Sequence, residues 1–381
     1  MSLARSTPRP WGGGIGLVAV LIAYSALSAG VSAQTVGKRY ELADLKALEG
    51  SFVALAEDVR PSVVAIRTYY AREPQHHEDP RIVIPVSQGS GFVIDPDGLI
   101  ATNRHVLEDA NSFAVILHTG QRYEATIQQA DHRSDLAVLR IDAQDLKPVT
   151  WGKQADVRIN QWSFACGNPF GLANDDGNTS ITYGVVSALG RQMTDQLAVD
   201  RNMQYYGNLI ETSSAISPGN SGGPLFNING EVIGVVTAIA TGSPVSEGHG
   251  YAIPADENTR RILETLADGK EVRYGFMGVV VVDVEPPQSR RVAHSQAHRG
   301  ARITAINPAD GPAAKAGLKR NDIIIAINGQ PVESADHLVR LVGFSPAGTK
   351  IETTHLRRNV KRKTEVILAD REEMLGVAAP E

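Results

Sequence analysis

The sequence predicts two folded domains, an all-β barrel or sandwich followed by a smaller domain of mixed β and α structure. Between residues 61 and 253, short β-type runs alternate with Gly and Asp turn signals. That pattern is typical of many short strands in one β domain. No regular alternation of strand and helix interrupts these runs, which argues against an open parallel sheet. Helical spacing returns only after residue 254 and marks the end of the first domain.

Two predicted helices flank the β region. The apolar spacing in ELADLKALEGSFVALAEDVR predicts a helix that ends near Pro61. In PADENTRRILETLADGK, the spacing of Ile262, Leu263 and Leu266 predicts a second helix. Gly269 is placed to end that helix, because glycine readily adopts the left-handed backbone of a helix terminus. We therefore expect a domain boundary at about residue 270.

The first 33 residues have the layout of a secretory signal peptide. Arg5 and Arg9 precede an apolar run, and Val31-Ser32-Ala33 forms a small-residue cleavage site. The alternative is an uncleaved membrane anchor, because residues 11 to 30 are nearly long enough to span a bilayer. The glycines and serines of this run favour cleavage, and in both cases the rest of the chain is exported.

Composition and isolated residues exclude several classes of protein. The 381 residues are 42% hydrophobic and 21% charged, which suits packed cores, and the net charge of −5 argues against a nucleic-acid binder. The single cysteine, Cys166, excludes an intrachain disulfide and is expected to be buried at a strand end. His76 and His77 are adjacent and lack spaced partners, so we expect neither a metal nor a cofactor. The basic run at residues 357 to 363 is predicted to be a solvated hairpin tip.

Ser221 lies among glycines in AISPGNSGGPLFNINGEVIGV. The pattern G-x-S-x-G also occurs at the nucleophile elbow of α/β-hydrolases, where a helix follows the serine. Here Pro224 and a short apolar segment lead directly to Asn229-Gly230, a strong hairpin signal. No helix fits in that space. The order that remains for a serine hydrolase is histidine, aspartate, serine.

His105 and Asp135 precede Ser221 in that order, each beside a predicted strand. A nucleophilic serine needs a base that removes its proton and a carboxylate that orients the imidazole. Gly219 would let its N–H point, with that of Ser221, at the oxygen on which charge develops. Each residue alone is commonly a surface, turn or loop residue. Their order and placement together predict a serine hydrolase.

Six segments resemble the HtrA/Deg family of exported serine proteases. They cover about residues 50 to 260 and read GSGFVIDPDGLIATNRHV, SDLAVLRI, CGNPFGLA, GVVSALGR, SPGNSGGPLFNINGEVIGV and GYAIPA. The resemblance implies a chymotrypsin-like double β-barrel in which His105, Asp135 and Ser221 form the catalytic triad. It also implies an oxyanion hole at Gly219, Asn220 and Ser221.

The segment before the nucleophile departs from the family pattern. The family usually reads T-D-A-A-I-N where this chain has Thr212-Ser213-Ser214-Ala215-Ile216-Ser217. In a double β-barrel protease, the residue six before the nucleophile, here Ala215, forms the base of the primary specificity pocket. No carboxylate stands there to pair with Lys or Arg, and burying an unpaired cation is costly. Cleavage after small or branched aliphatic side chains is therefore expected.

The C-terminal region resembles a PDZ domain of the bacterial protease-associated type. The segment that carries the resemblance reads ARITAINPADGPAAKAGLKRNDIIIAINGQPVESADHLVRLV. The resemblance implies that backbone N–H groups bind a peptide's terminal carboxylate, while the peptide adds as a strand. The loop that would do so is Phe276, Met277, Gly278 and Val279. Asn321-Asp322 replaces the usual Gly-Asp, and Asn tolerates the left-handed backbone that this turn requires.

The resemblance implies an ATP-independent serine endopeptidase that degrades unfolded or damaged proteins in stress response and protein quality control. We expect residues 1–33 to be a signal peptide or anchor, 34–270 a trypsin-like protease domain, 271–372 a PDZ domain, and 373–381 a tail. One alternative is a PDZ-bearing chaperone or adaptor with an inactive protease fold. The other is a membrane-anchored signalling protease with one dedicated substrate.

The resemblance also implies partners and a location. It implies a homotrimer packed through the N-terminal segment that holds Tyr40 and Phe52. Unfolded proteins are the expected substrates, and peptide C-termini the expected ligands of the PDZ domain. Nucleic acid is not expected, and a membrane is expected only if the N-terminal segment stays attached. The periplasm is the expected location, the alternative being an anchor in the inner membrane that faces the periplasm.

Overall fold

The computed structural model describes residues 42–72, 82–173, 175–191, 208–237, 250–284 and 299–376. The chain divides into two compact units, Met1–Ser51 and Phe52–Glu381. The expected signal peptide, Tyr40, and the His76-His77 pair lie outside the described residues. Within these ranges, no helix is long and apolar enough to cross a membrane.

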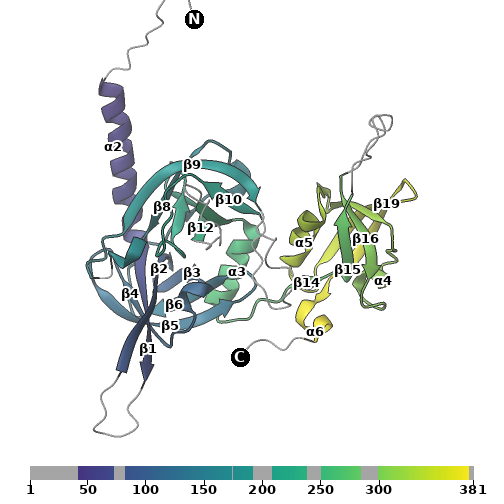
Figure 1. The fold of residues 1–381 in the computed structure, drawn as a ribbon, viewed down its shortest axis with the longest axis horizontal. Helices are drawn as coiled ribbons and strands as arrows, with labels where there is room; N and C mark the ends of the chain where they lie inside the picture. Colours follow the sequence, from purple (N-terminus) through teal and green to yellow (C-terminus); the bar gives the residue numbers. More distant parts are fainter. Residues whose placement is uncertain are drawn as a thin grey trace, which may run out of the picture. The chain divides into compact units, whose positions relative to one another are not determined.

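Six antiparallel strands close into the first barrel (Figure 1). Around the wall they are β1 (Val63–Arg72), β2 (Ile82–Asp95), β3 (Leu99–Asn103), β6 (Leu136–Ile141), β5 (Arg122–Asp131) and β4 (Ser112–Ile116). Side chains two residues apart on a strand face the same side. Val64 and Ile66 on β1, with Leu139 and Ile141 on β6, are accordingly buried in one cluster. The apolar runs of the sequence thus fill the interior of this barrel.

A second barrel forms from the strands that follow. In order they are β11 (Pro224–Phe226), β8 (Trp162–Gly167), β9 (Ser180–Arg191), β10 (Leu209–Thr212), β13 (Gly250–Pro254) and β12 (Glu231–Thr237). Pairing of β12 with β11 closes the ring, and the short strand β7 (Thr150–Trp151) adds to β12 in parallel. Two closed barrels confirm the predicted chymotrypsin-like fold.

The flanking helices lie where their apolar spacing predicts them. Helix α2 spans Leu42–Val59 and stops before Pro61, and α3 spans Glu257–Ala267. Ile262, Leu263 and Leu266 of α3 are buried. The helix starts at Asp256, whose side chain accepts a hydrogen bond from Thr259 N at 3.0 Å. Gly269 follows its end with φ of +71°, which is the conformation expected of it.

The residues after 274 form a smaller α+β fold with a core of its own. Its sheet runs β15 (Val279–Asp283), β16 (Ala301–Ile306), β17 (Ile323–Ile327), β19 (Lys350–Arg357) and β20 (Val360–Ile367), and β18 (Gln330–Pro331) pairs with β17. The pair β14 (Gly275–Phe276) and β21 (Ala369–Asp370) lies apart from that sheet. The helices are α4 (Pro312–Lys315), α5 (Ala335–Gly343) and α6 (Arg371–Leu375). Asn321 has φ of +71°, so asparagine adopts the predicted left-handed turn.

Two isolated sequence predictions meet different outcomes. Cys166 is fully buried on β8, and burial raises the pKa of its thiol to about 12, so the thiol stays neutral. The basic run does contain the predicted hairpin, with its turn at Arg358 and Asn359. Arg357 is not solvated in the way predicted, because its guanidinium forms an ion pair with the buried carboxylate of Asp322. The partner lies 35 residues away in sequence, so the local pattern could not show it.

Candidate active site

Two loops of the first barrel bring His105 and Asp135 into contact. His105 lies in the 3-10 turn Arg104–Leu107, directly after β3, and Asp135 ends the turn between β5 and β6. The Nδ1 atom of His105 lies 2.6 Å from Oδ2 of Asp135. The aspartate is fully buried, whereas 28% of the histidine side chain is exposed. A carboxylate at Nδ1 holds the proton there and leaves Nε2 as the basic nitrogen.

Backbone and side-chain donors hold Asp135 from three directions. Its Oδ1 accepts the backbone N–H of His105 at 2.9 Å. Its carbonyl oxygen accepts Arg104 N at 2.9 Å and Asn103 Nδ2 at 3.0 Å. The residue has φ of +56°, a conformation that costs a non-glycine residue energy and persists only where neighbours fix it. The orientation of the carboxylate is therefore set by the fold rather than by the histidine alone.

Glycines shape the loop that carries Ser221. Gly219 and Gly222 have φ of +100° and +83°. A Cβ atom on Gly219 would lie 2.2 Å from the carbonyl oxygen of Asn168, and one on Gly222 would lie 2.2 Å from Oγ1 of Thr102. No other residue fits at either position. Because Thr102 is on β3 just before His105, the serine loop packs against the strand end that carries the histidine.

The peptide groups before Ser221 are turned by specific hydrogen bonds. Phe170 N donates to the carbonyl oxygen of Pro218 at 2.8 Å. In a trans peptide the N–H lies opposite the C=O, so the N–H of Gly219 points away from Phe170. Asn220 N donates to Ser217 O at 3.0 Å within the loop. Of the three residues predicted for an oxyanion hole, Asn220 thus has its N–H engaged elsewhere, and Gly219 and Ser221 stay the candidate donors.

Ser90 is a site residue that the sequence reasoning missed. It is fully buried on β2, and its N–H donates to the carbonyl oxygen of Ser221 at 2.8 Å. Its hydroxyl donates to the carbonyl oxygen of Gly219 and accepts Asn168 N, both at 2.7 Å. Through its backbone and its side chain, Ser90 thereby joins Gly219 and Ser221 of the serine loop to Asn168 of the neighbouring loop. The available signal was a serine between two glycines in a buried strand, because a buried hydroxyl needs partners.

In the segment that departs from the family pattern, the serine hydroxyls form hydrogen bonds with neighbouring groups. Ser214 Oγ lies 3.0 Å from Thr212 Oγ1 and 3.1 Å from Ser163 Oγ, and all three residues are buried. Ser213 Oγ accepts Val185 N at 3.0 Å. The two serines in this segment therefore serve as local hydrogen-bonding groups beside β9 and β8.

Ala215, the predicted pocket base, is exposed, and its carbonyl oxygen accepts Thr182 Oγ1 at 2.8 Å. Residues 192–207 and 238–249, which follow β9 and β12, lie outside the described part of the chain. The role of Ala215 as the base of the pocket stays a prediction.

The predicted carboxylate-binding loop connects β14 to β15. Phe276 ends β14, Met277 is buried, Gly278 has φ of +81°, and Val279 begins β15. The carbonyl oxygen of Met277 accepts Ala313 N at 2.9 Å. The carbonyl oxygen of Gly278 likewise accepts a backbone N–H, at 3.0 Å. Since both peptides are trans, the N–H groups of Gly278 and Val279 are directed to the opposite side. Strand β15 is at the end of its sheet, where an added strand can pair.

Two domain families match this chain. Residues 89–235 match the trypsin-like peptidase domain, and residues 302–357 match the PDZ domain. Proteins called "Probable periplasmic serine endoprotease DegP-like" are similar over most of the chain. The one from Chlamydia pneumoniae is 34% identical over 88% of this chain and 73% of its own length. That from Chlamydia muridarum is 41% identical over 73% of this chain, and the chain spans only 53% of it.

Solved structures show the same likeness. The HtrA-type protease AlgW with a decapeptide is 28% identical, covers 84% of this chain and 98% of its own, and has a TM-score of 0.64. The serine endoprotease from Yersinia pestis is also 28% identical over 84% of this chain and 97% of its own, with a TM-score of 0.55.

Proposed function

The chain belongs to the family of DegP-like, HtrA-type serine endoproteases with a PDZ domain, and from that premise we propose that it cuts unfolded or damaged proteins without ATP. The observation that carries the proposal is the His105–Asp135 contact of 2.6 Å beside the glycine-flanked loop of Ser221. The runner-up, a chaperone or adaptor with an inactive protease fold, would not need this buried carboxylate at the imidazole.

In the proposed reaction, Ser221 Oγ attacks the peptide carbonyl carbon while Nε2 of His105 takes the hydroxyl proton. The Asp135 carboxylate stabilises the imidazolium that forms. The N–H groups of Gly219 and Ser221 stabilise the negative oxygen of the tetrahedral intermediate. The imidazolium then gives its proton to the leaving amine, and an ester on Ser221 results. Water, activated by the same imidazole, hydrolyses that ester and restores the serine.

The primary specificity pocket is proposed to rest on Ala215. No carboxylate is placed there by the sequence, so cleavage should follow small or branched aliphatic residues rather than Lys or Arg. Mapping the cut sites in an unfolded protein by mass spectrometry tests this, and a majority of cuts after Lys or Arg would contradict it.

The second domain is proposed to bind peptide C-termini at Phe276 to Val279. Support comes from the turned peptides of Met277 and Gly278 and from the open edge of β15. Amidating a peptide's C-terminus should weaken its binding by about 1.5–3 kcal/mol, the range for a hydrogen bond to a charged group. Equal affinities of the free-acid and amidated peptides would remove this proposal.

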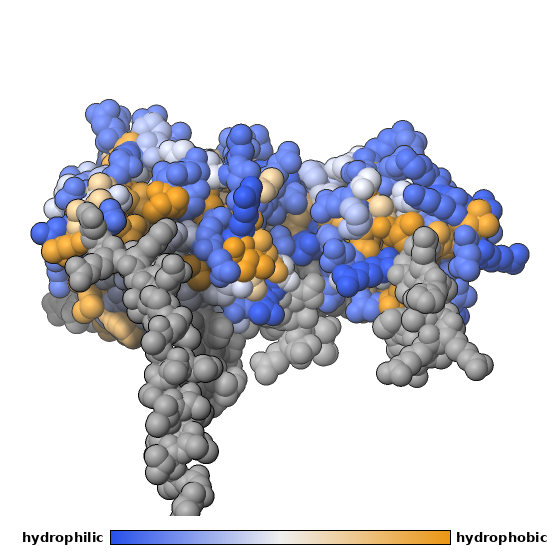
Figure 2. Space-filling view, turned by 90° about the horizontal axis from the view of Figure 1, so that it is seen from above, coloured by the Kyte–Doolittle hydropathy of each residue, from blue (hydrophilic) through white to orange (hydrophobic). Residues whose placement is uncertain are grey.

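A homotrimer is proposed on the family resemblance and on exposed aromatic surface. Phe52 contacts the rings of Trp162 and Tyr183, with centroids 4.9 and 5.5 Å apart. Trp162 and Tyr183 still expose 40% and 63% of their surface. Figure 2 shows that apolar patches interrupt the hydrophilic surface on the face it presents. Burial of such side chains between copies of the chain would stabilise an oligomer, which sedimentation of the mature protein can measure.

Export to the periplasm is proposed from the signal-like sequence of residues 1–33. The similar proteins are themselves named periplasmic. Sequencing the N-terminus of the mature protein decides between cleavage after Ala33 and a retained anchor. A retained anchor would favour the signalling-protease alternative.

The experiment that tests the protease proposal compares casein cleavage by the wild-type protein and by Ser221→Ala. The substitution should lower kcat on the order of 10⁴-fold or more and leave the fold intact. Near wild-type cleavage by Ser221→Ala would overturn the assignment.

A further inference from the structure

Tyr274, in the segment between α3 and β14, is a buried residue whose hydroxyl contacts the first barrel. Its side chain is 3% exposed, and its hydroxyl donates to Oδ2 of Asp131 at 2.5 Å. Burial, followed by the negative charge of Asp131, raises the pKa of Tyr274 well above its ordinary value. The phenol is therefore a protonated donor throughout the neutral range.

Asp131 ends β5, and its Oδ2 atom also accepts two hydrogen bonds from Ser134. The backbone N–H of Ser134 donates at 2.7 Å and its hydroxyl at 2.5 Å. Asp131 pairs with Leu136 across the sheet, so these bonds close the turn that ends in Asp135. One carboxylate oxygen thus joins Tyr274 to the turn that carries the catalytic aspartate.

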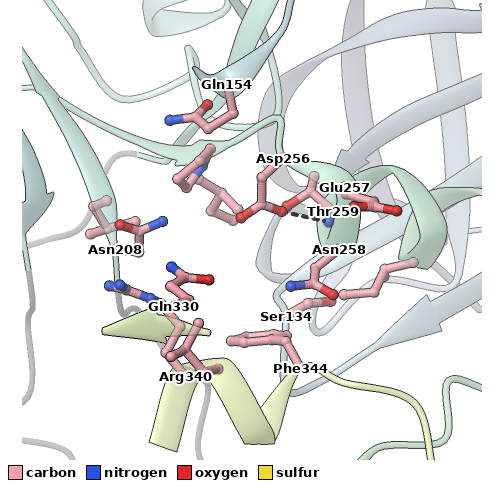
Figure 3. A pocket seen from close by; sticks show the side chains of 15 residues that line it. Ser134, Gln154, Asn208, Asp256, Glu257, Asn258, Thr259, Gln330, Arg340 and Phe344 are labelled. Carbon is pink, nitrogen blue, oxygen red and sulfur yellow. Dashed lines mark hydrogen bonds between the residues drawn. The ribbon is translucent and has the colours of Figure 1, made fainter. Parts of the chain in front are cut away.

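Ring and guanidinium contacts surround the same turn. The Arg133 guanidinium lies 5.4 Å from the ring centroid of Tyr274 and 5.6 Å from that of Phe344. Ser134 and Phe344 also line a cavity of about 270 Å³ beside the start of α3, where Asp256 caps the helix (Figure 3). The rings of Tyr274 and Phe344 thus lie beside the turn that ends in Asp135.

The backbone around Tyr274 bonds to the second domain, whereas its hydroxyl bonds to the first barrel. Its carbonyl oxygen accepts Arg371 N at 2.9 Å, and the next residue, Gly275, donates to Ser345 O at 2.7 Å. Both partners lie in the second domain. Tyr274 therefore connects that domain, two residues before Phe276, to the Asp131–Asp135 turn.

We propose that Tyr274 is a positioning residue for the catalytic acid. Through Asp131 and Ser134, its hydroxyl fixes the turn in which Asp135 adopts φ of +56°. That backbone conformation is intrinsically unfavourable for aspartate and needs external hydrogen bonds to persist. Loss of the hydroxyl lets the Asp135 carboxylate move relative to Nδ1 of His105. This inference rests on the proposed protease function.

The test compares Tyr274→Phe with Tyr69→Phe in the full chain. Tyr69 is a matched control, because it is also buried and its hydroxyl accepts Arg122 Nη2 at 2.9 Å. It lies on β1, and its partner Arg122 begins β5, at the opposite end of that strand from Asp131. Two readouts are used, kcat and KM for a short chromogenic peptide and the downfield proton NMR signal of His105 Nδ1–H. The NMR signal reports the His105–Asp135 bond without any turnover.

Tyr274→Phe should lower kcat about fivefold to tenfold with KM nearly unchanged, because one hydrogen bond to a charged group is lost at a distance from the reacting atoms. It should also shift or broaden the His105 signal. Ser134→Ala should act in the same direction, and Tyr69→Phe should change neither readout. Wild-type kcat and an unchanged signal in Tyr274→Phe, or equal changes in Tyr69→Phe, would overturn the inference. If the wild type shows no turnover while Tyr274→Phe still alters the signal, the protease proposal fails and the positioning inference stands.

Discussion

Two histidine–aspartate pairs can be compared among the described residues, His105–Asp135 in the first barrel and His355–Asp322 in the second domain. In the first, Nδ1 and Oδ2 are 2.6 Å apart and the histidine side chain is 28% exposed. In the second, Nε2 and Oδ2 are 3.7 Å apart, beyond a hydrogen bond, and both side chains are 1% exposed. The same two residue types therefore form two different kinds of site.

The two aspartates differ in the partners that the described residues give them. Asp135 Oδ2 contacts the ring of His105, and its Oδ1 accepts the backbone N–H of the same residue. Asp322 instead accepts Arg357 Nε at 2.8 Å and Nη2 at 2.7 Å. Burial alone would raise the pKa of Asp322, but the hydrogen bonds from Arg357 and from Lys319 N lower it. The carboxylate of Asp322 is thus a structural anion, with its charge already paired.

The histidines differ correspondingly. Burial, together with the nearby Arg357 charge, lowers the pKa of His355 despite the opposing charge of Asp322. A buried, neutral imidazole cannot contact a substrate. The comparison teaches that a catalytic base needs a carboxylate within hydrogen-bond distance of its ring and an exposed face, and neither follows from the presence of the two residues.

The largest expected effect is that of Asp135→Asn. The amide leaves the geometry nearly intact but favours the wrong imidazole tautomer, so kcat should fall by about 10⁴-fold. Kinetics with a short peptide substrate measure this. Asp322→Asn is the matched control and should leave kcat for that substrate unchanged. A comparable loss in both variants would mean that the two pairs are not different in kind.

The second-largest expected effect concerns the loop that carries Ser221, beside the His105–Asp135 pair. Ser90→Ala removes the hydroxyl bond to the carbonyl oxygen of Gly219. The Gly219 N–H should then be less well fixed, and kcat should fall by about tenfold, with KM nearly constant. Ser163→Ala, another buried serine with hydroxyl partners, serves as the control. Equal rates in Ser90→Ala and wild type would show that backbone bonds alone hold the loop.

A smaller and local effect is expected of Asp322→Asn on stability. Arg357 loses its charge partner, but its guanidinium is partly exposed, so the loss costs about 1 kcal/mol. Amides of β17 and β19 that exchange through opening of this domain should then exchange about fivefold faster. Hydrogen exchange with mass spectrometry measures this. Unchanged exchange in β17 and β19 would show that the pair is not structural.

The smallest effect is the pH dependence of the second domain. Because the folded-state pKa of His355 is lowered, the unfolded chain binds the proton more readily. The contribution of neutral His355 to the free energy of unfolding is complete above pH of about 6.5, the ordinary histidine pKa. It is lost as pH falls below that value. His337 has a pKa lowered by burial too and acts in the same direction. His355→Gln should reduce the slope of stability between pH 7.5 and 5.5, and an unchanged slope would assign the effect to His337.

The sequence predicted the parts of the site that depend on local pattern. The order of His105, Asp135 and Ser221 and the glycines at 219 and 222 are local features, and so is the left-handed turn at Asn321. Each follows from a residue type placed beside a strand or a turn. The strand runs likewise predicted an all-β barrel or sandwich, because buried strands need apolar side chains at regular spacing, and the family resemblance implied the double barrel.

What the sequence could not predict depends on long-range approach. Ser90 reaches Gly219 across 129 residues, and Tyr274 reaches Asp131 across 143. The glycines on both sides of Ser90 indicate a buried hydroxyl but not its partner, and Tyr274 has no comparable local signal. The prediction for Arg357 is wrong for the same reason, because its partner Asp322 lies just before β17, 35 residues away in sequence. Such contacts are products of the fold and are visible only once the fold is known.

The most direct test of the account is the site of covalent labelling by a fluorophosphonate probe. The probe reacts only with a serine whose hydroxyl is activated by a base and whose developing charge is stabilised. Peptide mapping by mass spectrometry should find one label, on Ser221, and Asp135→Asn should label far more slowly while Asp322→Asn labels at the wild-type rate. A protein that remains unlabelled, or that carries its label at another serine, would contradict the assignment of His105, Asp135 and Ser221.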